Sequence, residues 1–305
     1  MTRTPLRAMR LLSSKVFDRE TKRKQRDWSA RRPDAADGQY VLEEVGWRLA
    51  DKVVDLTRPS NRVLDIGCGF GHVSRHLQSD RVSHVTMLDS SEEVLRSATP
   101  PEDPKVGHSK LLCSEEVLDK VDGRFDLVLS SMAAHWINDL PGWFSRVFSL
   151  LEEDSPFIGV MLAEDTLFEL RCSLQLAEME RLGGVCVHMS PLIRPADIGG
   201  LLSAAGFTLV TLDSDEIEVG YPDMLHLLSD LQLMGESACA HSRSLTIGKD
   251  ILIAAQAIYQ EMYSKEGRFP ATFRTVSFIG WTPGKTTPKP AKRGAYNVSL
   301  KELSQ

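Results

Sequence analysis

The sequence predicts an α/β protein with a doubly wound parallel sheet and helices on both faces. Short apolar runs typical of buried strands alternate with segments of helical apolar spacing across the middle of the chain. The first run, Val63 to Ile66, ends in a turn that contains Gly67, Gly69 and Gly71. The chain has 305 residues, 42% of them apolar, so it can bury the core of one full domain with additional elements.

Two helices are expected ahead of the first strand. Residues 17–28 are highly charged, with an aromatic residue near each end, and form either a solvated helix or a lid that folds over a ligand. Residues 37–56 repeat Leu42, Val45 and Leu49 at three- and four-residue steps. This spacing places the three side chains on one face of an amphipathic helix.

The remaining elements alternate and then become mainly helical. Up to residue 165, helical spacing marks 72–77, 91–96 and 139–151, and strands are expected at 85–88, 110–113, 125–129 and 157–162. Beyond residue 165, helices are expected at 165–179, 195–206, 222–234 and 249–262, and strands at 207–212, 217–219 and 272–281. The proline-containing segment 282–305 is expected to be mostly disordered.

The acid ahead of the glycine turn indicates which ligand the turn binds. A dinucleotide-binding turn directs a pyrophosphate to the following helix, whereas Asp65, two residues before Gly67, disfavours phosphate. A carboxylate there suits a cationic amino-acid moiety, such as the ammonium and sulfonium of S-adenosylmethionine. The second strand ends at Asp89, 24 residues after Asp65, close to the roughly 20-residue spacing at which an acid meets ribose hydroxyls. These features together resemble the Rossmann-like core of the class I S-adenosylmethionine-dependent methyltransferases; the alternative is a Rossmann-like unit that binds nothing.

Further side chains at the carboxyl ends of the expected strands complete the candidate cofactor site. Many methyltransferases of this class have an aspartate after the third strand that accepts from the adenine amino group, where this chain has Ser114 and then Glu115. Ser114 can accept the same bond without the charge. A side chain at Gly67 would occupy ligand space. The predicted cofactor-binding residues are Asp65, Gly67, Cys68, Gly69, Gly71, Asp89, Ser90, Ser114, Glu115 and Ser130.

His135 is the candidate catalytic residue. It follows the fourth strand, at the sheet edge where substrates meet doubly wound folds. The ring can act as a base or polarise a substrate. The alternative is that His135 and Trp136 pack under the next helix, and the sequence favours this packing role because it identifies no partner for the ring.

Composition limits the compartment and the partners. The first 32 residues carry 11 basic and 3 acidic side chains, whereas the rest of the chain has a net charge of −14, which argues against broad nucleic-acid binding. The five cysteines are scattered and include no Cys-x-x-Cys pair, which indicates a reducing compartment. No apolar run approaches 18 residues, so no membrane span is expected. Residues 1–14 contain three arginines and no acid, which suits a mitochondrial presequence or a disordered basic tail.

No metal site is predicted. His72 and His76 lie four residues apart and could chelate a metal from one helix face. A non-haem iron site needs two histidines and a carboxylate, and the sequence identifies no third ligand. A solvated helix face is the expected role of the pair.

Several blocks of the chain resemble the mitochondrial complex I assembly factor 5 family. They are the charged segment from Phe17 to Trp28, the motif His135-Trp136-Ile-Asn-Asp-Leu-Pro141, the helix that starts at Asp165 and the segment Ile279-Gly-Trp281. The resemblance runs from about residue 16 to about residue 303, with the malonyl-carrier-protein methyltransferases of biotin synthesis as more distant relatives. The predicted organisation of the chain is a candidate presequence at 1–16, an N-terminal helical lid at 17–58, a methyltransferase core at 59–164, a helical cap with the remaining strands at 165–281 and a flexible tail at 282–305.

The resemblance implies an unusual reaction in a particular place. It implies a protein of the mitochondrial matrix, peripheral on the inner membrane, that acts with other assembly factors on complex I. The implied activity is hydroxylation of an arginine of the complex I iron–sulfur subunit near the quinone site, with S-adenosylmethionine expected in the pocket and no oxidant or metal assigned. Two alternatives remain: a methyltransferase acting on a protein or a carboxylate, and a non-catalytic assembly chaperone.

Overall fold

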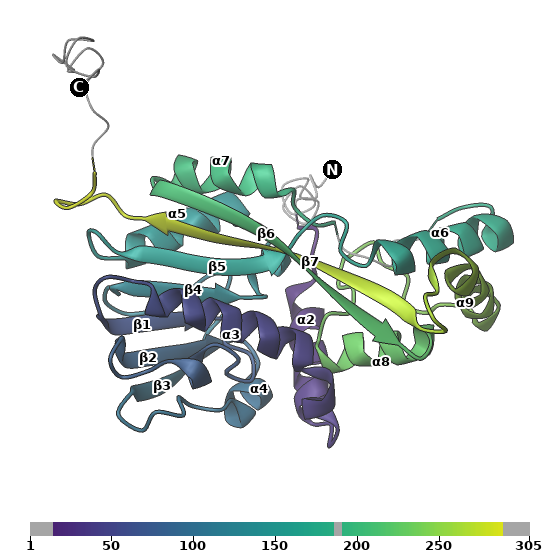
Figure 1. The fold of residues 1–305 in the computed structure, drawn as a ribbon, viewed down its shortest axis with the longest axis horizontal. Coiled ribbons are helices and arrows are strands. Elements are labelled where there is room, and N and C mark those ends of the chain that lie inside the picture. The colour runs from purple at the N-terminus through teal and green to yellow at the C-terminus, as the bar shows by residue number, and fades with distance from the viewer. Residues whose placement is uncertain (1–14, 186–190, 289–305) are drawn as a thin grey trace, which may run out of the picture.

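One mixed β-sheet forms the centre of the molecule (Figure 1). The computed structural model describes residues 15–185 and 191–288. The seven strands lie in the order β3-β2-β1-β4-β5-β7-β6. Their bounds are β1 Ser60–Ile66, β2 Val82–Asp89, β3 Gly107–Leu112, β4 Leu127–Ser131, β5 Pro156–Leu162, β6 Thr208–Tyr221 and β7 Phe269–Trp281. Strands β1 to β5 pair in parallel, so their carboxyl ends meet at one edge, where doubly wound sheets bind ligands.

The parallel pairing inferred from the strands up to residue 165 is confirmed, whereas β7 runs antiparallel to both of its neighbours. Strand β6 is also one continuous strand with an irregular register between Thr208 and Thr211, where the sequence predicted two short strands. Helix α8 (Met224–Leu233) lies beside the end of β6, and α9 (Lys249–Tyr263) lies further out at the same end (Figure 1). The chain therefore returns to the sheet at the end where β6 finished, and β7 pairs with β6 in the antiparallel direction.

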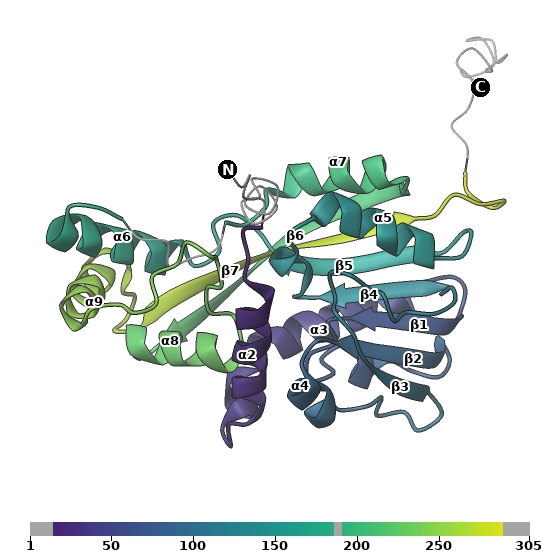
Figure 2. The same ribbon diagram turned by 180° about the vertical axis from the view of Figure 1, so that it is seen from behind.

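Helices cover both faces of the sheet, as predicted. Helix α3 (Tyr40–Val54) lies on one face and α5 (Leu140–Leu150) on the other, which Figures 1 and 2 show from opposite sides. Val63 belongs to the core under α3, whereas its neighbour Leu64 belongs to the core under α5, as the two-residue period of a strand requires. The two remaining helices of this part are α4 (Glu92–Ser97), after β2, and α7 (Pro195–Ala205), beside α5.

Helix α2 (Arg19–Ala30) stands at the carboxyl edge of the parallel strands, between the sheet and α8 (Figure 2). Its position confirms the helix expected over 17–28. Asp18 caps it by accepting from Thr21 N at 3.0 Å, and Asp18 N donates to the carbonyl of Cys239. A short 3₁₀ helix, η1 (Ala35–Gly38), connects it to α3.

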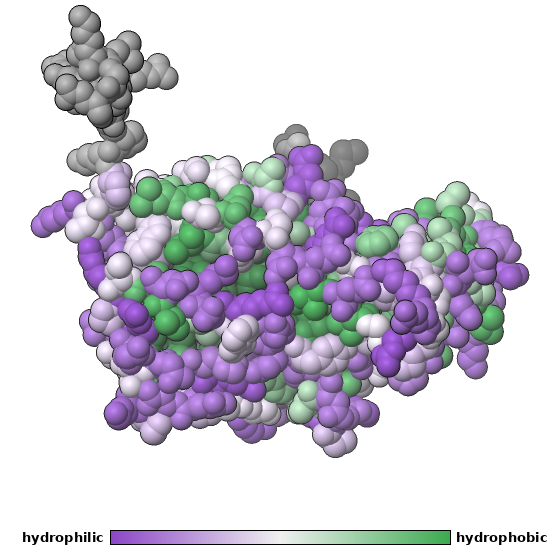
Figure 3. Space-filling view, viewed as in Figure 1, coloured by the Kyte–Doolittle hydropathy of each residue, from purple (hydrophilic) through white to green (hydrophobic). Residues whose placement is uncertain are grey.

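A helical cap extends beyond the sheet. It consists of α6 (Phe168–Leu182), α8 and α9, reached by the long ends of β6 and β7 (Figure 1). Apolar side chains are exposed at its outer end (Figure 3), among them Met179 on α6 and Ile253 on α9. Within the described ranges, no helix is both long and apolar enough to cross a bilayer.

Two local expectations differ from the structure. Residues 72–77 form only a 3₁₀ helix, η2 (Ser74–His76), because the amides of Thr99 and Glu102 occupy the Phe70 and Arg75 carbonyls, which a longer helix would need. Residues 282–288 are not loose: Thr282 is buried and its hydroxyl contacts the carbonyl of Ser155. The rest of the predicted flexible tail, from residue 289, lies outside the described residues, as do residues 1–14 of the candidate presequence. A third 3₁₀ segment, η3 (Ala134–Trp136), follows β4.

Candidate cofactor site

The glycine turn has the geometry that its sequence predicts. Gly67, Gly69 and Gly71 have φ values of +73°, +56° and +85°, a backbone region that side chains other than glycine rarely adopt. The amides of Gly67 and Cys68 donate to the carbonyl of Leu88 at 2.8 and 2.9 Å, which fixes the turn against the end of β2.

Asp65 lies at the base of the turn and is fully buried. Its Oδ2 accepts from the hydroxyl of Ser74 at 2.6 Å, whereas its Oδ1 has no hydrogen-bond partner. Burial raises the pKa of Asp65 to about 7. An unsatisfied buried carboxylate oxygen is costly, so this atom is suited to receive a cationic donor from a ligand.

Asp89, at the end of β2, is also fully buried and is held by backbone amides. Its Oδ1 accepts from Ser91 N at 2.9 Å, and its Oδ2 accepts from Gly69 N at 3.2 Å. The guanidinium of Arg26, from α2, donates to the same Oδ2 at 3.0 Å. Burial raises the pKa of Asp89, an effect that Arg26 opposes.

Glu115, rather than Ser114, is the polar side chain that follows β3 into the site. Its Oε1 accepts from the amide and the hydroxyl of Ser90 at 3.2 and 2.9 Å and from Arg26 at 3.0 Å. Its Oε2 accepts from Arg19 at 2.5 Å. Burial works to raise the pKa of Glu115, but Arg19 and Arg26 outweigh it and lower the pKa.

The predicted contribution of Ser130 needs correction. Its hydroxyl is fully buried and donates to the carbonyl of Ile66 at 3.1 Å, so it joins β4 to β1. The next residue, Ser131, lines the small void at the glycine turn, and its hydroxyl is buried without a partner. Alternation along β4 places these two side chains on opposite faces, and the sequence could not say which face held the site.

His135 has a partner that the sequence did not reveal. Glu236, in the segment after α8, lies 3.0 Å from His135 Nε2 and accepts from Trp136 Nε1 at 3.1 Å. The amide of Leu162 donates to His135 Nδ1 at 3.4 Å, so the neutral ring carries its proton on Nε2 and donates it to Glu236. Glu236 is 101 residues from His135 in sequence and stands three residues after the end of α8, so no local motif connects the two.

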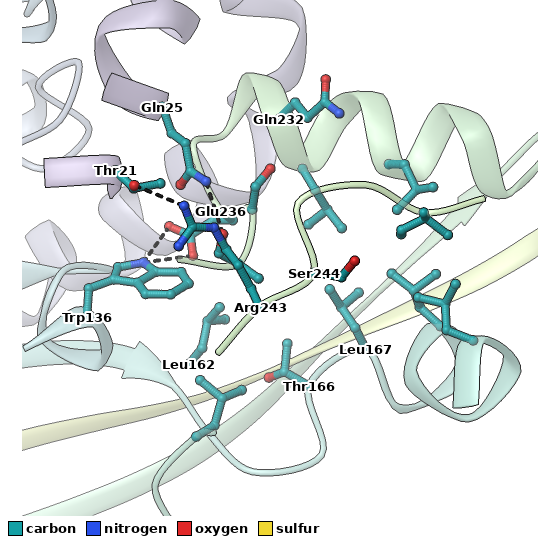
Figure 4. A pocket seen from close by; sticks show the side chains of 18 of the residues that line it. Thr21, Gln25, Trp136, Leu162, Thr166, Leu167, Gln232, Glu236, Arg243 and Ser244 are labelled. Atoms are coloured by element: carbon teal, nitrogen blue, oxygen red, sulfur yellow. Dashed lines mark hydrogen bonds between the residues drawn. The ribbon is translucent and has the colours of Figure 1, made fainter. Parts of the chain in front are cut away.

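A cavity of about 570 Å³ adjoins this pair, between the sheet edge and the cap. Figure 4 shows Trp136, Glu236 and Arg243 gathered at one end, with leucines such as Leu167 along the wall. Glu236 also lines the void at the glycine turn, which measures about 30 Å³. Glu236 therefore lies between the cofactor corner and the larger cavity.

The described residues do not assemble a metal site. No group of three or more histidine, cysteine, aspartate or glutamate side chains within 15–185 and 191–288 is arranged to hold a metal ion. The expectation that His72 and His76 form a solvated helix face is wrong for His72, whose side chain is buried. Its Nδ1 lies 3.4 Å from Oε2 of Glu43. His76 contacts the same carboxylate at 2.8 Å.

Comparisons with known proteins agree with this geometry at the level of the fold. A methyltransferase-domain family model matches residues 35–212. A putative methyltransferase of Bacillus halodurans is 17% identical with a TM-score of 0.54, covering 77% of this chain and 99% of its own. The YcgJ protein of Bacillus subtilis is 16% identical with a TM-score of 0.51, covering 78% and 98%. The chain is thus a member of the methyltransferase-domain class, with the Rossmann-like class I fold that the sequence predicted.

Curated relatives narrow the class to a family. The mitochondrial arginine-hydroxylase NDUFAF5 of Danio rerio is 46% identical over 95% of this chain and 90% of its own length. The protein of the same name from Homo sapiens is 44% identical over 95% and 84%. A malonyl-[acyl-carrier protein] O-methyltransferase of Methylovorus is 30% identical over 88% and 90%. The chain belongs to the family of the mitochondrial arginine-hydroxylase NDUFAF5, which confirms the resemblance in the sequence.

Proposed function

We propose that this protein is an arginine hydroxylase that acts in mitochondrial complex I assembly and binds S-adenosylmethionine at the glycine turn. The observation that carries the proposal is 44–46% identity to arginine-hydroxylases over 95% of the chain. The proposed target is an arginine of the complex I iron–sulfur subunit near the quinone site. The proposed location is the matrix, peripheral on the inner membrane, with other assembly factors as partners.

The described residues fit the proposed cofactor. Asp89 would accept from the ribose hydroxyls, as acids at the end of the second strand do in nucleotide-binding sheets. Asp65 Oδ1 lacks a partner and would accept from the ammonium, while Glu115 and Ser90 would lie beside the adenine. When bound, S-adenosylmethionine supplies a methyl group on a sulfonium, which a methyltransferase transfers.

On the substrate side, we infer a positioning role for His135. Its Nε2–H is donated to Glu236, so that nitrogen is not a free base. Glu236 is the one carboxylate among the described residues that line the 570 Å³ cavity. A carboxylate is the natural partner of a guanidinium, and apolar walls suit the aliphatic stem of arginine. His135 would hold Glu236 ready for the substrate arginine.

The Glu236→Gln variant tests this role. We expect this variant to form much less hydroxylated product than the wild type, because a neutral amide binds a guanidinium more weakly than a carboxylate does, by about 1.5–3 kcal/mol. S-adenosylhomocysteine affinity, measured by calorimetry, should change little. Glu180→Gln on the exposed surface of α6 is the matched control. Full product with Glu236→Gln would remove Glu236 from substrate binding.

The reaction itself is tested by peptide mass spectrometry of the complex I iron–sulfur subunit. Cells that lack this protein would be rescued with the wild type, with an Asp65→Asn/Asp89→Asn double variant, or with Glu93→Gln as the control. Both aspartate replacements keep the side-chain shape and remove the charge that would meet the cofactor. We expect one arginine to gain a single oxygen with the wild type and the control only.

Other outcomes favour the alternatives. A mass gain of one methylene group would identify the protein as a methyltransferase, which is the activity in the name of the Methylovorus relative. Assembly rescued by every variant, with no modified residue, would assign a non-catalytic assembly factor.

A further inference from the structure

Helix α2 presents a row of positive charge to the site. Arg19, Lys22 and Arg26 are spaced by three and four residues, which places them on one face of the helix. Their side chains are 21%, 1% and 13% exposed. Lys24 lies on the outer face and is 69% exposed, whereas Arg23 borders the basic face and is 38% exposed.

Each cation of this basic face has a specific partner in the site. One Arg26 nitrogen, Nη1, lies 3.0 Å from both Asp89 Oδ2 and Glu115 Oε1. Arg19 donates to Glu115 at 2.5 Å and to the carbonyl of Trp136 at 3.2 Å. Lys22 Nζ donates to the carbonyls of Gly235 and Ser237 and lies 3.4 Å from the centre of the Trp136 ring.

These contacts fill the place of the proposed cofactor. The void left at the glycine turn is about 30 Å³, an order of magnitude below the roughly 300 Å³ at which ligand pockets begin. The Arg26 guanidinium already donates to Asp89 Oδ2, the oxygen that also accepts from the Gly69 amide on the turn. A nucleoside therefore cannot enter while Arg26 stays in this position.

We propose that α2 is an internal occupant of the cofactor pocket, and that Arg26 competes with the nucleoside for Asp89 and Glu115. The inference rests on the proposed cofactor. Ribose hydroxyls and the adenine amino group donate hydrogen bonds as Arg26 does, so neither buried carboxylate is left unpaired after the exchange. The exchange is feasible because the desolvation of a buried ion pair offsets much of its attraction. In this arrangement Arg26 pairs with both carboxylates and helps to bury them.

The test uses the full chain with Arg26→Met, which keeps the apolar stem and removes the charge. Lys24→Met, on the outer face of the same helix, is the matched control. S-adenosylhomocysteine is the probe, and calorimetry measures its Kd. We expect Arg26→Met to bind about tenfold tighter than the wild type or more, and Lys24→Met to bind as the wild type does.

Three results overturn the proposal and differ in meaning. Equal affinity of Arg26→Met and wild type would show that α2 does not compete. Weaker binding by Arg26→Met would make Arg26 a ligand of the cofactor. No binding by either protein would remove the proposed cofactor and this inference together.

A second measurement needs no variant. Amide hydrogen exchange of the wild-type chain is followed over residues 19–30 with and without S-adenosylhomocysteine. Displacement of the basic face predicts faster exchange in α2 when the probe is bound, together with slower exchange at the glycine turn. Slower exchange in both segments would contradict displacement.

Discussion

At pH 8, the Asp65→Asn variant is expected to resist unfolding better than the wild type while binding S-adenosylhomocysteine more weakly. Burial raises the pKa of Asp65 from 3.8 to about 7, so the ionised carboxylate destabilises the ligand-free fold. At 1.36 kcal/mol per pKa unit, the cost reaches about 4 kcal/mol once the group is ionised in both states. Asparagine resembles the protonated acid and retains an acceptor for the Ser74 hydroxyl.

The stability difference between Asp65→Asn and the wild type should depend on pH in one direction. Because the pKa is raised in the folded state, the folded protein binds more protons than the unfolded chain between about pH 4 and pH 7. The contribution of Asp65 to stability is therefore fully present below about pH 4 and is lost as the pH rises through 7. The advantage of Asp65→Asn in urea should be near zero at pH 4 and largest at pH 8. Asp80→Asn, at an exposed position, should show no such trend.

A variant that is less stable than the wild type by the same amount at every pH would contradict this account. It would mean that the bond from Ser74 to the carboxylate matters more than its burial. The expected pattern, with stability gained and affinity lost, is typical of a binding group held in a costly state until its ligand arrives.

Local patterns made much of the site predictable. Glycines at positions of positive φ, an acid before them and an acid at the end of the next strand are all features of short segments. Asp65, Gly67 and Asp89 lie together because two neighbouring parallel strands end at the same edge.

The groups that complete the site come from far along the chain. Arg26 is 63 residues from Asp89, and Glu236 is 101 residues from His135. A charged helix such as α2 is interpreted from sequence as solvated unless its packing is known, because Arg26 and Lys24 are both basic yet their side chains are 13% and 69% exposed. The direction of β7 was hidden for a similar reason, since it depends on where α8 and α9 lie.

Replacing Gly67 is expected to damage the fold, whereas replacing Gly69 is expected to damage ligand binding. A Cβ at Gly67 would lie 2.4 Å from the Cβ of Ala133, inside the protein rather than in ligand space, which corrects the expectation from the sequence. Gly67→Ala adds this overlap to a backbone φ of +73°. We expect a loss of roughly 2–5 kcal/mol in unfolding free energy.

Gly69→Ala isolates the other effect. A Cβ at Gly69 has no neighbour closer than the His72 ring at 3.5 Å. The only cost of Gly69→Ala to the unfolding free energy is therefore the strain of a non-glycine residue at a φ of +56°, about 1–2 kcal/mol. The added methyl group lies on the turn whose Gly69 amide donates to Asp89, where the glycine motif lets a ligand approach the backbone. Urea unfolding and S-adenosylhomocysteine calorimetry on both variants should separate them, with Gly69→Ala folded but binding at least tenfold more weakly. If Gly69→Ala binds as the wild type does, the ligand does not approach the turn at Gly69, and the cofactor site must be placed elsewhere along the sheet edge.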